Sequence, residues 1–343
     1  MPKVELHVHL EGSIRPATLL ELAARNRVAL PAEDEEGIRA WYSFRDFDHF
    51  IEIYLAVSRC IRTPADLELI TRRFLEGQAS QRVLYSEVTL TAYTHHRNSG
   101  MEFADQLAAI NRARAWASAE LGVEMRLTLD YPRQLDARGF ESVVDWAIEG
   151  RHDGVAAIGL GGPEVGHPPD AFAQGFARAR AAGIPSAPHA GETEGPPSIW
   201  GALRSLAADR LGHGVRCLED PGLVDELRAR RIPLEVCPTS NVRLGVVPSL
   251  ADHPLPRLRA EGLVVTVNSD DPPMFGTTLT REYERTASAF GWDARDLRAL
   301  VRAAAAAAFL PDEERVRLGN RLEASFRRVE EAGPELAGGA RGP

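Results

Sequence analysis

The sequence predicts an α/β protein, a single (β/α)8 barrel of the TIM type with extra helices after the first strand and at the C-terminus. Three observations predict it: eight short β-rich runs recur along the chain, amphipathic helical stretches separate them, and no linker divides the 343 residues. A prior of about 150 residues per domain would give about two domains. Because no linker is present, we expect residues 1–331 to form one barrel domain and the Gly/Pro-rich residues 332–343 to form a flexible tail.

The predicted strands are runs of β-branched and aliphatic residues bounded by turn residues. They are Val4–Leu10, Leu84–Leu90, Met125–Asp130, Val155–Leu160, Pro185–His189, Arg210–His213, Pro233–Cys237 and Leu263–Asn268. The first connection is the longest and holds an aromatic segment, residues 41–54. An insertion after a barrel strand lies on the catalytic rim, so helices here can cover a pocket. The alternative is a local core in which only one or two side chains face a ligand. Terminal helices are expected at Ala303–Leu310 and Glu313–Glu331.

Charge and hydropathy argue against nucleic-acid and membrane partners. Lys and Arg number 40 against 49 Asp and Glu, a net charge of −9, and no segment gathers basic residues into a stripe that could follow phosphates. The longest apolar run, Ala303–Leu310, is less than half the length of a membrane-spanning helix. Three scattered cysteines, Cys60, Cys217 and Cys237, are too few for a disulfide framework and favour a cytoplasmic location. A homo-oligomer remains open.

The first predicted strand carries two histidines on its polar face. Side chains alternate across a strand, so the apolar residues 4, 6, 8 and 10 face the outer helices while His7 and His9 face the barrel interior. Two imidazoles at i and i+2 near the carboxyl end of a barrel strand can bind one metal ion from the same side. Alone, this pair is a weak signal, and two unrelated histidines on a polar face are the alternative.

Polar clusters also follow the fifth, sixth and eighth predicted strands: His189-Ala-Gly-Glu192, Gly212-His213-Gly214 and Asn268-Ser-Asp-Asp-Pro272. Barrel enzymes take catalytic residues from the ends of several strands, so we expect these clusters to share one site. Such a site would bring together three imidazoles and a carboxylate, from His7, His9, His189 and Asp270. These ligands suit zinc, with iron, manganese or cobalt as chemical substitutes. A metal with one open position would make water acidic enough to act as hydroxide near neutral pH.

Three further residues have catalytic or binding interpretations. Glu192, outside the ligand set, could act as an acid whose pKa is raised by desolvation; the alternative is a helix-capping acid worth about 1 kcal/mol. His213, between two glycines, could orient the attacking water, provide a fourth imidazole ligand, or be structural. Asp271 could accept a hydrogen bond from the substrate, and an exposed Asp-Asp-Pro turn is the alternative.

Five motifs together resemble the adenosine deaminase family of metal-dependent hydrolases. They are His-Val-His-Leu-Glu-Gly (7–12), His-Ala-Gly-Glu (189–192), Leu-Gly-His-Gly (211–214), Cys-Pro-Thr-Ser-Asn (237–241) and Ser-Asp-Asp-Pro (269–272), in the family's order. The match spans nearly the whole chain, and the set is highly specific although each motif alone is weak. The resemblance implies one zinc ion per chain, bound by His7, His9, His189 and Asp270.

The resemblance also implies substrate contacts. It makes Glu192 the proton donor to purine N1, puts His213 on the attacking water and has Asp271 hydrogen-bond purine N7. The backbone of Gly162, within Gly-Leu-Gly-Gly-Pro-Glu (159–164), would meet purine N3. The implied reaction is hydrolytic: water adds at C6 of a 6-aminopurine and ammonia leaves, a division of labour between metal and glutamate that zinc deaminases of an unrelated fold also use.

Two departures from the family pattern bear on the substrate. Adenosine-specific members carry Asp to hold the ribose where this chain has Glu11, and an Arg near the second strand where this chain continues into Leu-Thr-Ala-Tyr-Thr-His-His (90–96). Glu11 resembles the branch of adenine deaminases and of aminodeoxyfutalosine deaminases of menaquinone synthesis, and the rim around Thr89–His96 favours the latter. His95 and His96 could touch a substrate carboxylate, but two solvent-facing loop histidines are the preferred interpretation.

Two other functions are weighed against a purine nucleoside deaminase. A hydrolase of the same barrel could act on an amide or phosphoester, but the bridging lysine typical of two-metal relatives is missing from the predicted strand ends. A non-catalytic barrel could bind a nucleoside as a sensor, but such a chain would be expected to lack the glutamate or a metal ligand, and all of them are present. Adenosine deaminase proper and adenine deaminase remain the nearest alternatives.

Overall fold

The computed structural model describes residues 1–331, and it is built around eight parallel strands in this range. The strands are β1 Lys3–Glu5, β2 Val83–Leu90, β3 Glu124–Leu129, β4 Val155–Ile158, β5 His189–Ala190, β6 Leu211–His213, β7 Leu234–Val236 and β8 Val265–Val267. Each predicted strand overlaps one of them, although β1 and β5 are shorter than predicted. The predicted flexible tail lies outside the described residues, and the assignment of residues 1–331 to one domain stays a prediction.

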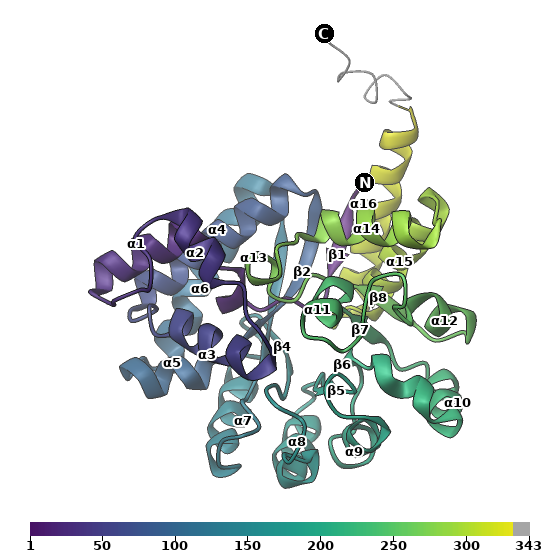
Figure 1. Ribbon diagram of the computed structural model, residues 1–343, viewed down its shortest axis with the longest axis horizontal. Helices are drawn as coiled ribbons and strands as arrows, with labels where there is room; N and C mark the ends of the chain where they lie inside the picture. The colour runs from purple at the N-terminus through teal and green to yellow at the C-terminus, as the bar shows by residue number, and fades with distance from the viewer. Residues whose placement is uncertain (332–343) are drawn as a thin grey trace.

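The strands form two four-stranded parallel sheets, β1-β2-β3-β4 and β5-β6-β7-β8, that close into a barrel. Parallel bridges join the sheets at both seams, Val8 with Asp270 and Ile158 with Ser186. Figure 1 shows the strands in the middle of the molecule with helices around them. The α/β barrel fold predicted from the alternation of strands and helices is therefore confirmed.

Helices cover the outside of this barrel. They are α1 Pro16–Asn26, α2 Glu35–Trp41, α3 Phe47–Ser58, α4 Pro64–Ser80, α5 Ala92–Ser99, α6 Phe103–Leu121, α7 Arg138–Gly150, α8 Ala173–Ala181, α9 Pro196–Ser205, α10 Pro221–Arg230, α11 Pro238–Arg243, α12 Leu255–Ala260, α13 Pro272–Phe275, α14 Leu279–Phe290, α15 Ala294–Ala307 and α16 Asp312–Glu331. Short 3-10 turns lie at Glu11–Ser13, Pro169–Phe172 and Val215–Glu219. Among the described residues, none of the helices has both the length and the apolar character that crossing a bilayer requires.

The helix predicted at Ala303–Leu310 was placed wrongly. The alanine-rich run is the second half of α15, which begins nine residues earlier, because Asp293 and Asp296 form a capping box at its N-terminus. The helix ends at Ala307, and Ala308 turns to extended geometry shortly before Pro311. The predicted final helix is found as α16.

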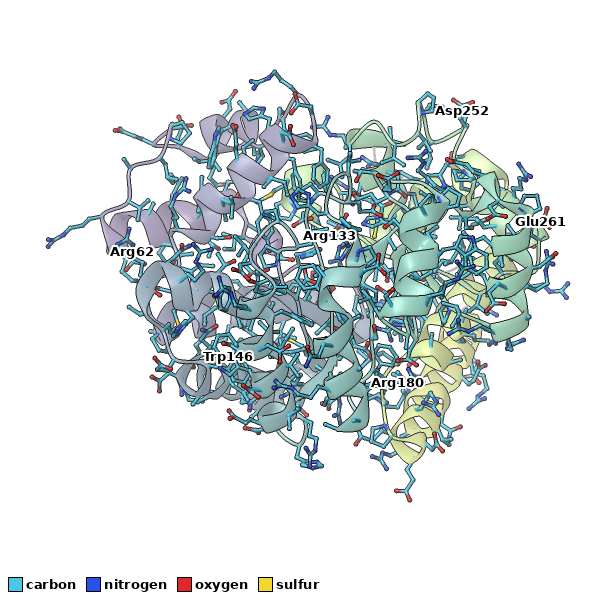
Figure 2. The ribbon with its side chains drawn as sticks, turned by 90° about the horizontal axis from the view of Figure 1, so that it is seen from below. Arg62, Arg133, Trp146, Arg180, Asp252 and Glu261 are labelled. Carbon is cyan, nitrogen blue, oxygen red and sulfur yellow. The ribbon has the colours of Figure 1, made fainter. Side chains whose placement is uncertain are left out.

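Burial follows the alternation expected for the first strand. Val4, Leu6, Val8 and Leu10 are at most 2% exposed and pack into the two hydrophobic clusters between the strands and the helices. The intervening polar residues point into the barrel, where they meet other buried polar groups. In Figure 2, Arg62, Asp252 and Glu261 project at the edge of the molecule. His7 and Glu5, from the polar face of the first strand, therefore make their contacts inside the barrel.

Candidate metal and substrate site

Three histidines meet at the carboxyl ends of β1 and β5. His7 and His9 follow β1, and His189 begins β5. One ring nitrogen of each lies within 4.8 Å of the others, and the His7 and His189 ring centroids are 4.6 Å apart. All three are at most 9% exposed. The structure therefore gathers three imidazoles from positions far apart in the sequence.

Asp270 completes this cluster from the end of β8. Its backbone N–H donates to the His7 carbonyl, and its own carbonyl accepts from the His9 N–H at 2.9 Å, so the β1 and β8 ends are held together. Its φ of 64° lies in the left-handed region, a strained conformation that this pairing maintains. Asp270 Oδ1 lies 3.5 Å from His7 Nε2 and 3.4 Å from His9 Nε2.

The donor set fits a metal ion. Within residues 1–331, His7 Nε2, His9 Nδ1 and His189 Nδ1 are buried without a hydrogen-bond partner, and buried polar atoms are rarely left this way. A cation between the rings would give His7 Nε2 a partner beside Asp270 Oδ1. Three imidazoles with a carboxylate are ligands that zinc accepts in catalytic sites. His213 also falls in a candidate metal group with His7, Cys237 and Asp270.

Glu192 lies beside this cluster in the loop after β5. Its carboxylate is 5% exposed, and Oε1 lies 3.4 Å from His213 Nε2. Burial, reinforced by the negative charge of Asp270, raises the pKa of Glu192 well above its usual value. The raised pKa favours the protonated form of Glu192.

Glu164 fixes the backbone of that loop, a role that sequence reasoning missed. Its buried carboxylate accepts from the N–H groups of Gly191, Glu192 and Thr193, each at 2.8 Å. It also accepts from Ser198 at the start of α9. Glu164 ends the Gly-rich motif 159–164, but nothing in that motif points to its distant partners.

His213 ends β6 and is oriented by Asn241. Asn241 Nδ2 lies 3.1 Å from His213 Nδ1, and Asn241 Oδ1 lies 3.1 Å from His253 Nε2. An amide nitrogen donates, so His213 Nδ1 accepts and the ring proton belongs on Nε2. Nε2 faces Glu192 and Asp270. The Cys-Pro-Thr-Ser-Asn motif thus contributes a residue that sets the His213 tautomer.

Asp271 points into the pocket against Gly12. It is 2% exposed, and among the described residues its Oδ1 has no hydrogen-bond partner. A Cβ at position 12 would lie 1.6 Å from this oxygen, so only glycine leaves room for the carboxylate. Burial and the charge of Asp270 raise the pKa of Asp271 well above its usual value. The interpretation as an exposed turn is wrong.

One pocket joins these groups to the insertion after β1. Its polar lining includes His9, His189, Glu192, His213, Asp270, Asp271 and Gly162, whose φ is 86°. Helix α3 supplies an apolar wall: Phe47, Phe50, Ile51, Tyr54 and Leu55. The alternative of a local core left one or two residues of the aromatic segment for a ligand, whereas four of them, Phe47, Phe50, Ile51 and Tyr54, line the pocket. Their i, i+3, i+4, i+7 spacing marks one helical face, a signal readable in the sequence.

The structure places Glu11 behind this pocket. Its fully buried carboxylate accepts from Thr91 N–H and pairs with His95 Nε2, both at 2.9 Å, and accepts from Tyr54 Oη at 3.2 Å. Among the residues described, Glu11 is absent from the pocket lining. The expectation that His95 faces solvent from a loop is wrong, because α5 turns it inward to Glu11; His96 is partly exposed on the same helix.

Comparison with known sequences gives one consistent family. A family model described as adenosine deaminase matches residues 2–325. An aminodeoxyfutalosine deaminase of Streptomyces avermitilis is 42% identical over 94% of this chain and 90% of its own length. An adenine deaminase of Streptomyces coelicolor is 39% identical over 92% of this chain and 93% of its own length.

Solved structures agree with the sequences. An adenine deaminase from Arthrobacter aurescens has a TM-score of 0.89 at 34% identity, covering 95% of this chain and 99% of that one. An amidohydrolase from Burkholderia ambifaria with bound Zn has a TM-score of 0.88 at 28% identity, covering 97% of this chain and 92% of that one. This chain therefore shares the fold of these two proteins along nearly its whole length.

Proposed function

The chain belongs to the adenosine deaminase family and is a hydrolytic deaminase of a purine-type substrate, and we propose that it acts on a 6-aminopurine nucleoside with one zinc ion per chain. The leading substrate is aminodeoxyfutalosine, which would place the enzyme in menaquinone biosynthesis. The observation that carries the proposal is the convergence of His7, His9, His189 and Asp270 beside the pocket that Glu192 lines.

The metal would be held by the three histidines and Asp270. When bound there, a zinc ion supplies Lewis-acid chemistry and makes water acidic enough to attack near neutral pH. The histidines are neutral ligands in that role, and Asp270 contributes one negative charge. The proposed ligands come from β1, β5 and β8, so the barrel holds them in place before substrate arrives.

The chain's own groups manage protons on the purine. Glu192, whose pKa is raised by burial, donates a proton to N1, so that the aromatic ring accepts addition at C6. His213 presents its Nε2 proton beside Glu192 and orients the attacking water. Asp271 has its pKa raised, so its protonated form donates to the acceptor N7. The backbone N–H of Gly162 donates to N3.

Helix α3 covers the remaining face of the substrate. Its apolar side chains exclude water and stack against a flat base, as aromatic side chains do in ligand sites. Phe50 and Phe275 stack at 5.2 Å between ring centroids, which connects this wall to α13 directly after Asp271. A closed wall beside the acid and the metal ligands favours addition of one ordered water.

The substrate is tested by a spectroscopic screen of zinc-loaded protein. Adenine, adenosine, 2′-deoxyadenosine, methylthioadenosine and aminodeoxyfutalosine are followed by loss of the aminopurine absorbance. We expect aminodeoxyfutalosine to give the highest kcat/KM. The similarity to adenine deaminases makes adenine the second candidate, and faster turnover of adenine would replace the nucleoside proposal. Five flat traces with fully metallated protein would contradict deamination itself. The cytoplasmic location stays a prediction.

A further inference from the structure

Asp130 is a buried carboxylate in the pocket to which the proposed chemistry gives no role. It follows β3, is 5% exposed, and lines the same pocket as His9, Glu192 and Asp271. Across the part of the chain that the structure describes, its Oδ1 has no hydrogen-bond partner. A buried acceptor without a donor costs free energy, and at a pocket wall a ligand can supply that donor.

Two glycines after β4 make room for this carboxylate. A Cβ at Gly161 would lie 2.3 Å from Asp130 Oδ2, and one at Gly159 would lie 2.7 Å from Oδ1. The backbone is also fixed here, because Pro132 and Gly161 form a parallel bridge. The carboxylate is therefore packed against the Gly-rich segment that continues to Gly162. It is a placed group with little freedom to turn away.

A buried arginine, Arg133, follows Asp130 three residues later in the chain. Arg133 is 3% exposed and donates to the carbonyls of Leu160 and His189, at 3.1 and 2.5 Å. Figure 2 shows it near the middle of the molecule, away from the charged residues at the edge. Burial raises the pKa of Asp130 to about 7, although the positive charge of Arg133 acts in the opposite direction. A donor from a ligand would favour the ionised form further.

Asp130 enters the pocket from a different part of the barrel than the proposed metal ligands. Those ligands follow β1, β5 and β8, whereas Asp130 follows β3 and contacts the segment after β4. With C6 at the metal and Gly162 at N3, purine N9 lies across the ring from the metal, on the N3 side. N3 itself is an acceptor, so a carboxylate there needs another donor. In a nucleoside that donor is a sugar hydroxyl.

We propose that Asp130 accepts hydrogen bonds from the sugar hydroxyls of a nucleoside, so that the enzyme selects nucleosides over free purine bases. This inference rests on the proposed function and names its substrate class. The two carboxylate oxygens can accept from the two neighbouring hydroxyls of ribose. A free base would offer only its ring N–H at the same place, and the test separates the two donors.

The test measures binding of deaminated purines, which carry no 6-amino group and which the enzyme therefore does not consume. Zinc-loaded protein is titrated by calorimetry with inosine, 2′,3′-dideoxyinosine and hypoxanthine. Each hydrogen bond to a charged group contributes about 1.5–3 kcal/mol, and dideoxyinosine lacks both hydroxyls, so wild type should bind inosine at least roughly tenfold more tightly than dideoxyinosine. In Asp130→Asn most of this preference should disappear, with little change for the other two ligands.

The matched control is Asp136→Asn in the same β3–α7 loop. Asp136 has a side chain 60% exposed and pairs with Arg138, so the same chemical change occurs at the surface. This variant should keep the wild-type preference. If Asp130→Asn does not fold, Gly161→Ala provides a second variant, because its Cβ would displace the Asp130 carboxylate. It should also lose the preference for inosine.

Each remaining outcome decides against the inference in a distinct way. An unchanged preference for inosine in folded Asp130→Asn or Gly161→Ala would show that the hydroxyls are recognised elsewhere. A loss of hypoxanthine affinity equal to that of inosine would assign Asp130 to the base. Equal binding of inosine and dideoxyinosine by wild type would show that the enzyme does not recognise the sugar hydroxyls. Turnover of a purine in the screen would still support the proposed deaminase function. Failure of every purine in that screen would instead overturn the proposed function.

Discussion

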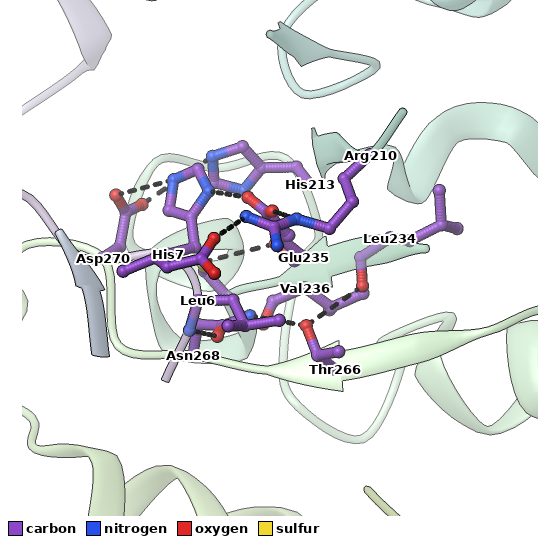
Figure 3. Close-up of polar contacts among 12 residues, drawn as sticks. Leu6, His7, Arg210, His213, Leu234, Glu235, Val236, Thr266, Asn268 and Asp270 are labelled. Carbon is purple, nitrogen blue, oxygen red and sulfur yellow. Dashed lines mark hydrogen bonds and ion pairs between the residues drawn. The ribbon is translucent and has the colours of Figure 1, made fainter. Parts of the chain in front are cut away.

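Glu235 accepts a hydrogen bond from His7 Nδ1 at 2.9 Å, and this contact leaves His7 Nε2 facing Asp270 (Figure 3). Glu235 is itself held by Arg210 Nε at 2.5 Å, and Arg210 also pairs with the buried Glu87. A carboxylate that holds the outer nitrogen of a metal-binding histidine fixes its tautomer and raises its basicity.

Replacing Glu235 is therefore expected to weaken metal binding. In Glu235→Gln the partner of His7 loses its charge, and the dissociation constant for zinc should rise about 10- to 100-fold. Competition with a chromophoric chelator measures this directly. Glu226→Gln, which removes a half-exposed acid on α10, is the control and should leave zinc affinity unchanged. Unchanged affinity in a folded Glu235→Gln would mean that the chain Glu235–Arg210–Glu87 serves stability alone.

Glu192→Gln tests the proposed proton donor. The amide has the same shape but cannot donate an acidic proton, so turnover should fall by roughly 10²- to 10⁴-fold while one zinc per chain is retained. Steady-state rates and metal analysis of the same preparation give both values. Glu194→Gln, in the same loop and only partly buried, should keep near-normal turnover. Near-normal turnover in Glu192→Gln would remove Glu192 from the mechanism.

Gly12→Ala tests whether the position of Asp271 matters. The added Cβ would come within 1.6 Å of Asp271 Oδ1, so the carboxylate must move. A shift of about 1 Å in a substrate-contacting group can cost about 100-fold in rate, and we expect a loss of kcat/KM of this order. Gly319→Ala in α16, where a Cβ meets nothing within 4 Å, should leave kinetics unchanged. Normal kinetics in Gly12→Ala would contradict the role given to Asp271.

Glu11→Ala distinguishes a structural role from a substrate contact. The change leaves Thr91 N–H and His95 Nε2 without their buried acceptor, which costs about 1–3 kcal/mol for each group. We therefore expect a lower free energy of unfolding in urea, measured without any ligand. Glu21→Ala, at a half-exposed position on α1, should change it little. Unchanged stability with a strongly raised KM would restore Glu11 as a substrate ligand.

The sequence predicted the barrel and the convergence of strand-end residues because both depend on local patterns. His7 and His9 follow the alternation of a strand, and His213 and Asp270 follow strand ends. Glu11 departs from such reasoning, since a 3-10 turn at Glu11–Ser13 ends the alternation and turns its side chain behind the pocket.

Other contributors have no local signature. The partners of Glu164 lie 27 to 34 residues further along the chain, and His7, the partner of Glu235, lies 228 residues away. The roles of both residues therefore depend on the closed barrel. A single charged residue inside a buried strand, as in Leu234-Glu235-Val236, is the only hint in the sequence. Asp130 had no such hint in the sequence, because the space for its carboxylate is left by Gly159 and Gly161, which follow β4.

Asp66, in α4, accepts a hydrogen bond from Asn26 of α1, and we expect this contact to make the free energy of unfolding depend on pH. It is fully buried in the capping box of α4, where its Oδ2 accepts from Asn26 Nδ2 and Thr63 N–H, both at 2.9 Å. Burial raises its pKa, but these hydrogen bonds outweigh burial, and the pKa of Asp66 is lowered from its usual 3.8. The folded protein therefore favours the ionised form more than the unfolded chain does.

The sign of the pH effect follows from this lowered pKa. Well above pH 3.8 the carboxylate is ionised in both states and its full contribution to stability is present. As the pH falls below 3.8 and then through the lowered pKa of the folded state, that contribution is lost. Asp66→Asn should lower the free energy of unfolding by about 1–3 kcal/mol at pH 7, and the difference from wild type should shrink between pH 4 and pH 3. Urea denaturation at pH 7, 5, 4 and 3 measures it. Asp34→Asn, an exposed helix cap, is the control, because Asn caps a helix as well as Asp. A difference for Asp66→Asn that stays constant down to pH 3 would mean that packing, and not the charge of Asp66, holds α1 against α4.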